Sequence, residues 1–401
     1  MNSITKFISI VLFLLCFMML VSCVKQKTEW KGTIEEVNGV TLVKNPREGL
    51  WDSNEKANVT IIQELQIGEL DGPEEFLFDY ISDVAVNSTG DIYVADRRLN
   101  EIRKFNKDGE YLLTLGRRGQ GPGEFQSINI ISVNSHDELI AFDNMLQRVS
   151  IFSDNGEHIK TTKKLVTDSW IEPSKIFSTD GTYVVFGRLD NSLKLFHEFN
   201  QDWNITESYI DYEFIDNKEF EEIQLGLGFN HENCLFQNNG NILYTKYYYD
   251  NQILIYKNKG LVKIISRESD IKKPYEILVF HDVNKAMNVR SDQKYQDYDF
   301  HTFGRGIAFF GKSFQNSLGI FQLSDGLIAN FLYIRKSKDI RKSKDIRELG
   351  VELYDSEGKF LYYSNLGENL YYDIRCMDSN DLFYAIDRKE YHKIIIFRLG
   401  Y

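Results

Sequence analysis

The sequence is poor in proline, cysteine and basic charge. Five prolines and 27 glycines in 401 residues exclude a collagen-like chain, and an apolar fraction of 42% excludes a disordered one. Four cysteines are too few for a small domain held together by disulfides. The net charge of −12 leaves no basic stripe for phosphate contacts, so we expect no nucleic-acid partner.

Aromatic residues are abundant. The chain has 23 tyrosines and 28 phenylalanines, which together with the scarcity of proline favour β-structure. The length permits two or three domains unless internal repeats organise the chain as one.

The first residues have the pattern of a processing segment. Lys6 supplies a positive end, and an apolar run follows from residue 8 to residue 21, which is too short for a comfortable membrane span. The run ends in Leu20-Val21-Ser22-Cys23, which resembles the lipobox of bacterial lipoproteins. The resemblance implies a signal peptide at 1–22, cleavage before Cys23, lipid on Cys23 and attachment to a membrane.

We therefore expect a lipid-anchored protein of the bacterial cell envelope, at the outer membrane, with the leaflet left open. The alternatives are an ordinary signal peptide with an incidental cysteine and an uncleaved anchor. After Cys23 the sequence shows no transmembrane run. Cys234 and Cys376 either pair in the envelope or remain two isolated thiols, and no C-x-x-C pair predicts a zinc site.

Self-similarity organises the rest of the chain. Its clearest unit spans residues 81–116, where four short apolar strands are separated by turns such as Asn87-Ser88-Thr89-Gly90 and Asn106-Lys107-Asp108-Gly109. The turn before the second strand recurs at 134–137, 178–181, 237–240, 323–326 and 378–381. Six such copies predict an all-β fold, a six-bladed β-propeller with four-stranded antiparallel blades.

The ends of the chain indicate how the ring closes. The last copy has only three strands, the third at 393–397, and residues 58–65 form a suitable fourth strand. We expect these N- and C-terminal strands to share one blade, which removes exposed edges. The predicted organisation is a signal peptide at 1–22, a tether and lead-in at 23–50, and a propeller at 51–401 with an insertion at about 261–319.

The unit resembles NHL repeats, and the chain is similar to six-bladed propeller lipoproteins of the Bacteroides type. The resemblance is carried by residues 90–96 (Gly-Asp-Ile-Tyr-Val-Ala-Asp), by the turn at 105–109 and by the Gly-Gln-Gly-Pro-Gly-Glu-Phe run at 119–125. It implies the fold and little about activity. Related propellers with lactonase or lyase activity are metal enzymes, and their ligands do not map onto this chain.

Two groups of residues are candidates for ligand binding. Arg117 and Arg118 precede the glycine-rich run at 119–123, which lacks the Gly-Lys-Ser/Thr ending of a P-loop. That run is interpreted as a crossover between blades, with an anion at the rim as the alternative. Asp96, Asp143 and Asp387 end second strands in three copies. They either cap turns or form carboxylates for Ca²⁺ or a sugar hydroxyl.

No catalytic constellation is predicted. The seven histidines include no H-x-x-x-H or H-E-x-x-H pattern, and the sequence has no G-x-S-x-G elbow. We therefore expect no catalytic residue, metal site or cofactor. The favoured function is a non-catalytic binding or scaffold module for an unidentified protein or glycan. The alternative is a metal-dependent propeller lyase or lactonase, so enzymatic activity remains an open question with a negative answer favoured.

Overall fold

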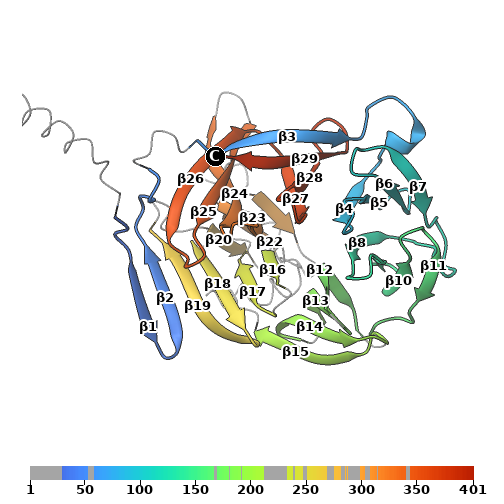
Figure 1. The fold of residues 1–401 in the computed structure, drawn as a ribbon, viewed down its shortest axis with the longest axis horizontal. Helices are drawn as coiled ribbons and strands as arrows, with labels where there is room; N and C mark the ends of the chain where they lie inside the picture. The colour runs from blue at the N-terminus through green and yellow to red at the C-terminus, as the bar shows by residue number, and fades with distance from the viewer. Residues whose placement is uncertain are drawn as a thin grey trace, which may run out of the picture.

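A computed structural model shows strands arranged in blades around a common centre (Figure 1). The structure describes residues 29–52, 58–166, 169–179, 181–190, 192–211, 233–237, 240–246, 251–268, 275–280, 285, 287, 299–302, 308–313, 315–339 and 344–401. The predicted signal peptide and Cys23 lie outside these ranges.

Four blades are contiguous in sequence and have their strands in chain order. Blade 1 contains β4 (Ile81–Val86), β5 (Ile92–Asp96), β6 (Glu101–Phe105) and β7 (Tyr111–Leu115). Blade 2 contains β8 (Ile128–Val133), β9 (Leu139–Asp143), β10 (Arg148–Phe152) and β11 (His158–Thr161). Blade 3 contains β12 (Ile171–Thr179), β13 (Thr182–Leu189), β14 (Lys194–Asn200) and β15 (Ile205–Asp211). Blade 5 contains β23 (Gln315–Gln322), β24 (Ile328–Asp339), β25 (Lys344–Tyr354) and β26 (Phe360–Glu368).

The other two blades use strands from the N-terminal region. Blade 4 contains β16 (Asn233–Phe236), β17 (Ile242–Thr245), β18 (Gln252–Lys257) and β19 (Gly260–Arg267), to which β2 (Val40–Asn45) and β1 (Thr33–Val37) are added. Blade 6 contains β27 (Tyr372–Met377), β28 (Phe383–Asp387), β29 (Lys393–Gly400) and β3 (Thr60–Ile67). β3 is antiparallel to β29 from the pair Ile67 and Ile394 to the pair Thr60 and Gly400. The predicted six blades and their closure by both chain ends are therefore confirmed.

The recurrent turns are held by their first side chain. Asn87 Oδ1 accepts hydrogen bonds from the N–H groups of Thr89 (3.1 Å) and Asp91 (2.7 Å), which fixes the chain reversal between β4 and β5. Gly90 completes this turn with φ +89°, a conformation that suits glycine. Asn134, Asn200, Asp355 and Asp378 accept equivalent bonds in other turns.

Apolar packing occurs between blades. The described core divides into six clusters, and each joins one pair of consecutive blades around the ring. The second strands β5, β9 and β28 are buried along their whole length because both of their faces meet a neighbouring blade. Each blade therefore depends on two neighbours, and the ring is complete only when blade 6 is formed.

The lead-in packs on the outside of the ring. β1 and β2 form a hairpin through Asn38 (φ +52°) and Gly39 (φ +80°), and β2 pairs with β19 in parallel. Buried Asn45 donates to the carbonyls of Ser266 (3.1 Å) and Gly358 (2.9 Å). The range expected as a tether and lead-in is thus attached to blades 4 and 5 from residue 30 onward.

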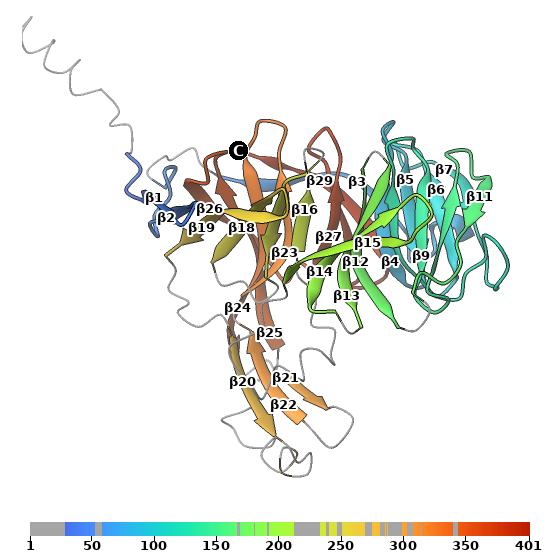
Figure 2. The same cartoon turned by 90° about the horizontal axis from the view of Figure 1, so that it is seen from below.

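An insertion between blades 4 and 5 forms its own small sheet of β20 (Tyr275–Phe280), β22 (Ala308–Ser313) and β21 (Asp299–Thr302). Figure 2 shows this sheet and the far ends of β24 and β25 projecting from one side of the ring. The sequence Ile-Arg-Lys-Ser-Lys-Asp is repeated in tandem at 334–345, and its residues 334–339 and 344–345 lie at that end of β24 and β25. In the described part of the chain, the helices are all too short or too polar to cross a membrane.

Closure of the ring can be tested with two matched isoleucine substitutions. Ile67 lies in β3 with 1% of its surface exposed, whereas Ile34 on the outer hairpin is 48% exposed. Ile67→Ala leaves a cavity between blades 6 and 1, so we expect it to lower the free energy of unfolding by about 2–4 kcal/mol. Ile34→Ala should change it by less than about 0.5 kcal/mol. Equal denaturation midpoints for the two variants would contradict a closing role for β3.

The stability of blade 3 is expected to depend on pH through His197. Its ring is fully buried, its Nε2 donates to the Gly187 carbonyl (3.2 Å), and its Nδ1 accepts from Ser208 (2.8 Å). Burial lowers the pKa of His197 from 6.5 to about 4. Between these values the unfolded chain binds a proton that the folded chain does not, so stability falls as pH falls, by at most about 1.4 kcal/mol per pH unit.

The measurement is urea denaturation of wild-type protein and His197→Gln at several pH values from 7 downward. The variant should be less stable at pH 7 and show a shallower loss across this window. His136→Gln, at an exposed position, is the matched control and should retain the wild-type slope. A His197→Gln profile parallel to wild type would disprove the assignment.

Candidate functional site

The innermost strand of each blade lies at the ring axis. Among the innermost strands β4, β8, β12, β16, β23 and β27, contacts join β4 to β8, β8 to β12, β16 to β23, β23 to β27 and β27 to β4. In five of them, all except β16, the pairing with the next strand is interrupted by a register shift. Such a bulge leaves one residue out of the ladder and redirects the side chains around it. It therefore places residues at the axis that strict alternation would have turned into the blades.

Charged residues gather next to three of these bulges. We name Asp83, Lys175, Asp373, Arg375 and Arg388 the axial charge cluster. Asp83 follows the bulge in β4, Lys175 follows the bulge in β12, and Arg375 is itself the residue left out of the β27 ladder. Asp83 and Arg375, which are 292 residues apart in sequence, are thus brought together from the neighbouring blades 1 and 6.

Asp83 links three blades at the axis. Its Oδ1 accepts from Arg375 Nε at 2.8 Å, and its Oδ2 accepts from the N–H of Ile131 in β8 at 2.9 Å. Arg375 Nη1 also lies 3.5 Å from Asp373 Oδ1. These contacts tie blade 6 to blades 1 and 2.

Asp373 and Arg388 extend the same network. Arg388 Nη1 lies 2.9 Å from Asp373 Oδ2, and its Nη2 donates to the Ile81 carbonyl at 3.0 Å. Burial opposes ionisation, but the guanidinium groups of Arg375 and Arg388 hold the pKa of Asp373 below its ordinary value. The side chains of Asp373 and Arg375 remain 36% and 21% exposed, so solvent reaches them at the axis.

Lys175 has a different environment. Its Nζ donates to the Cys234 carbonyl at 3.2 Å and lies 5.6 Å from the centre of the Phe321 ring. Among the described residues, no carboxylate forms an ion pair with it. Burial, together with repulsion from Arg375, lowers the pKa of Lys175.

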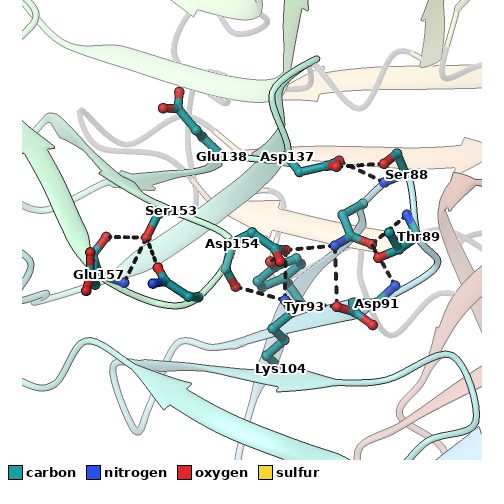
Figure 3. A network of polar contacts seen from close by, with 12 residues as sticks. Ser88, Thr89, Asp91, Tyr93, Lys104, Asp137, Glu138, Ser153, Asp154 and Glu157 are labelled. Carbon is teal, nitrogen blue, oxygen red and sulfur yellow. Dashed lines mark hydrogen bonds and ion pairs between the residues drawn. The ribbon is translucent and has the colours of Figure 1, made fainter.

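Lys104 provides a comparison within the same chain. Its Nζ is 2.9 Å from Asp91 and 2.8 Å from Asp154, and its ammonium group lies over the Tyr93 ring (Figure 3). Burial acts against the charge here too, but the hydrogen bonds to Asp154 and Asp91 raise the pKa of Lys104. The fold thus compensates Lys104 with carboxylates from two blades, whereas the contacts of Lys175 among the described residues are the Cys234 carbonyl and the Phe321 ring.

The predicted aspartates are the last residues of the second strands β5, β9 and β28. The buried Asp96 carboxylate accepts hydrogen bonds from backbone N–H groups of Asp79, Tyr80, Arg98 and Leu99. Asp143 accepts equivalent bonds from Gln126, Ser127, Met145 and Leu146. Asp387 accepts one from Lys389 and lies 3.6 Å from Lys393 Nζ. The geometry is that of turn capping; ligand binding by these residues stays a prediction.

The predicted arginines lie on an exposed crossover. Arg117 pairs with Glu124 at 2.8 Å while 81% of its side chain is exposed, and Arg118 is also exposed. The backbone of this run is shaped by Gly116, where an added Cβ would lie 2.3 Å from the buried Phe125 ring. A rim site for an anion at Arg117 and Arg118 stays a prediction, and neither residue belongs to the axial charge cluster.

Cys234 and Cys376 are both thiols. Burial raises the pKa of Cys376 to about 12, so its thiol stays protonated near neutral pH. Within the described ranges, His, Cys, Asp and Glu residues form no group of three or more that could hold a metal ion.

Sequence reasoning missed all five residues of the axial charge cluster. The available signal was a single charge inside an apolar first strand, as in Lys175-Ile176-Phe177 and Ile374-Arg375-Cys376. Such a charge would ordinarily be assigned to the solvent face. Only the bulge and the ring closure show that it faces the axis.

The axial ion pairs can be tested with two Arg→Met substitutions. Arg375→Met removes the partner of two carboxylates at the axis, so we expect it to lower the free energy of unfolding by about 3 kcal/mol. Arg117→Met breaks an exposed pair and should cost at most about 0.5 kcal/mol. Denaturant titration of both variants checks the difference, and an Arg375→Met protein as stable as Arg117→Met would show that the axial pairs contribute little.

The comparisons with known proteins agree with this architecture. A protein of the DUF4221 family from Bacteroides vulgatus ATCC 8482 is 9% identical, with 86% of this chain and 98% of that chain covered and a TM-score of 0.52. A protein from Bacteroides fragilis NCTC 9343 is 13% identical, with 90% and 100% covered and a TM-score of 0.51. Similarity at this level shows the fold alone.

A virginiamycin B lyase from Staphylococcus aureus is 11% identical, with 86% of this chain and 100% of that chain covered, and its TM-score of 0.43 supports no conclusion. None of the curated proteins compared with the chain matches it. The family DUF5128, described as 6-bladed beta-propeller, matches residues 51–303, which is more than half of the chain. The protein therefore belongs to this family of six-bladed β-propellers.

Proposed function

We propose that the protein is a lipid-anchored, non-catalytic binding module of the bacterial cell envelope, at the outer membrane, which holds a protein or glycan ligand at the mouth of its axis. We further propose that its blades are repeats of the NHL type, on the basis of the residues at 90–96 and 105–109. The observation that carries the binding role is the axial charge cluster, where charged side chains of blades 3 and 6 remain accessible to solvent inside a closed ring.

Rigidity supports a binding role. Arg375, Asp83 and Asp373 are fixed by mutual contacts at 2.8–3.5 Å, and their strands are held by apolar packing on both sides. A preorganised polar site loses little conformational entropy when a ligand binds. The two carboxylates of the cluster are engaged by guanidinium groups, which suits the holding of a ligand better than proton transfer.

The position of the lead-in supports a propeller held close to its membrane. Residues 24–29 separate the predicted lipid on Cys23 from Trp30, whose Nε1 donates to Asn45 at 3.0 Å. Six residues span at most about 20 Å when fully extended. A tether of this length would keep the outer edge of blade 4 near the lipid surface.

The test combines lipid attachment with ligand capture, using the full chain in a bacterial host that lipidates proteins. Cys23→Ala should abolish incorporation of an alkynyl fatty acid, because the thiol that carries the lipid is gone, whereas the matched Cys16→Ala should be labelled like wild type. Chemical crosslinking in intact cells followed by affinity purification should recover a saturable envelope component with the wild-type protein. Mass spectrometry identifies both the label and the component.

The capture control is residues 1–28 fused to an unrelated soluble protein, which shares the anchor and lacks the propeller. Recovery of the same component with this fusion would contradict binding by the propeller. Fatty-acid labelling that persists in Cys23→Ala would contradict the anchor. Turnover of a lactone or glycan that requires a stoichiometric metal would replace the binding role with the enzymatic alternative.

A further inference from the structure

We propose that the axial charge cluster binds a carboxylate of the ligand, seated against Lys175 and Arg375. This inference rests on the proposed binding function and names the ligand class of that site. It does not involve the lipid anchor, the exposed arginines or the turn aspartates.

The first argument is the balance of charge. The cluster contains three basic side chains, Lys175, Arg375 and Arg388, and two acidic ones, Asp83 and Asp373. Asp83 pairs with Arg375, and Asp373 pairs with both Arg375 and Arg388. A protonated Lys175 therefore leaves one positive charge without a counter-ion among the described residues, and a group with one negative charge would balance it.

The second argument is geometric. Lys175 reaches across the axis from β12 to the Cys234 carbonyl in β16 and the Phe321 ring in β23, while Arg375 faces the axis from β27. Among the described residues, Arg375 makes its ion-pair contacts through Nε and Nη1. Both side chains keep part of their surface accessible. A carboxylate between them would accept charge-assisted hydrogen bonds from two blades.

The charged and titratable groups that act on Lys175 are Asp83 of β4, Cys234 of β16, and Arg375 and Cys376 of β27. Burial and Arg375 favour the neutral amine, while Asp83 is held by Arg375 and favours the charged form only from a distance. A bound carboxylate would favour the charged amine. Binding should therefore take up a proton when the pH lies above the lowered pKa of Lys175, and affinity should rise as pH falls.

The experiment uses the full chain in uncharged detergent micelles and isothermal titration calorimetry. The probes are sodium galacturonate, its uncharged counterpart galactose, and sodium succinate, which separates an acidic sugar from a free acid. Galacturonate should bind at least tenfold more tightly than galactose. Succinate that binds as well as galacturonate would indicate recognition of the carboxylate alone, and weaker succinate would indicate an acidic sugar; both support the proposal.

Lys175→Met removes the charge and keeps the length of the side chain. We expect it to weaken galacturonate binding roughly tenfold to a hundredfold and to melt at or above the wild-type temperature. The matched control is Lys160→Met, at a half-exposed lysine in blade 2, which should bind like wild type. Titrations of wild type in two amine buffers of different ionisation enthalpy should show proton uptake, which keeps the test informative should Lys175→Met fail to fold.

Three results would overturn the proposal: equal affinity for galacturonate and galactose, including no binding of either; wild-type affinity in a folded Lys175→Met protein; or binding without proton uptake at pH values where affinity changes. Recovery of the envelope component by wild type and Lys175→Met alike would reject the carboxylate site and leave the proposed binding function standing. Loss of recovery with the wild-type propeller would reject the proposed function itself.

Discussion

The pairing of β3 with β29 is the contact on which the rest of the ring depends. Each apolar cluster lies between two blades, so no blade has a complete core of its own. Without β3, the outer side of blade 6 would expose β29 and the clusters on both of its faces would lose Val59 and Ile67. The N-terminal segment also reinforces the ring along blades 4 and 5, where Asn45 bonds to backbone groups that lie more than 200 residues away.

This construction determines which polar residues can meet a ligand. The second strands β5, β9 and β28 are buried on both faces. The aspartates that end them accept hydrogen bonds from backbone N–H groups of the neighbouring turns. Polar residues between blades pair with each other, as Lys104 does with Asp91 and Asp154 (Figure 3). The innermost strands have a neighbour on one edge only. At the axis a side chain can be surrounded by protein and still be reached by solvent, so an accessible charge held in a fixed position is found there.

Much of the fold could be predicted from the sequence because its determinants are local. Asn87 and Gly90 specify their turn by side-chain capping and positive φ, and the apolar second strand beside them is read from five consecutive residues. This turn and the strand after it occur six times in the sequence, which predicts six blades. The β1–β2 hairpin was not predicted, although its Asn38-Gly39 turn is a local signal of a hairpin. Its pairing with β19 joins residues more than 200 positions apart and leaves no local trace.

The candidate site was the least predictable part, for a related reason. Asp96 and Asp143 attract attention because they recur, but recurrence is what a capping role requires in every copy. Lys175 and Arg375 occur once each, inside strands whose bulges shift the alternation that a reader of the sequence would rely on. Residues that serve the fold repeat with the blades, whereas residues that serve one ligand at the axis need to occur only once.

Lys104, which is buried, and Lys175, which is half-buried, show how the difference can be recognised in the structure. Lys104 and Lys175 both lose hydration, and a lysine that loses hydration without a counter-ion is destabilising. At Lys104 two carboxylates offset that cost, and the result is a contact that joins blades 1 and 2. At Lys175 no described carboxylate offsets the lost hydration. Asp83 lies near enough to affect the pKa of Lys175, but it forms its ion pair with Arg375. The acids of the cluster pair with the arginines, and among the described residues Lys175 has no carboxylate partner, which is the physical argument for our proposal that an anionic ligand binds at the axis.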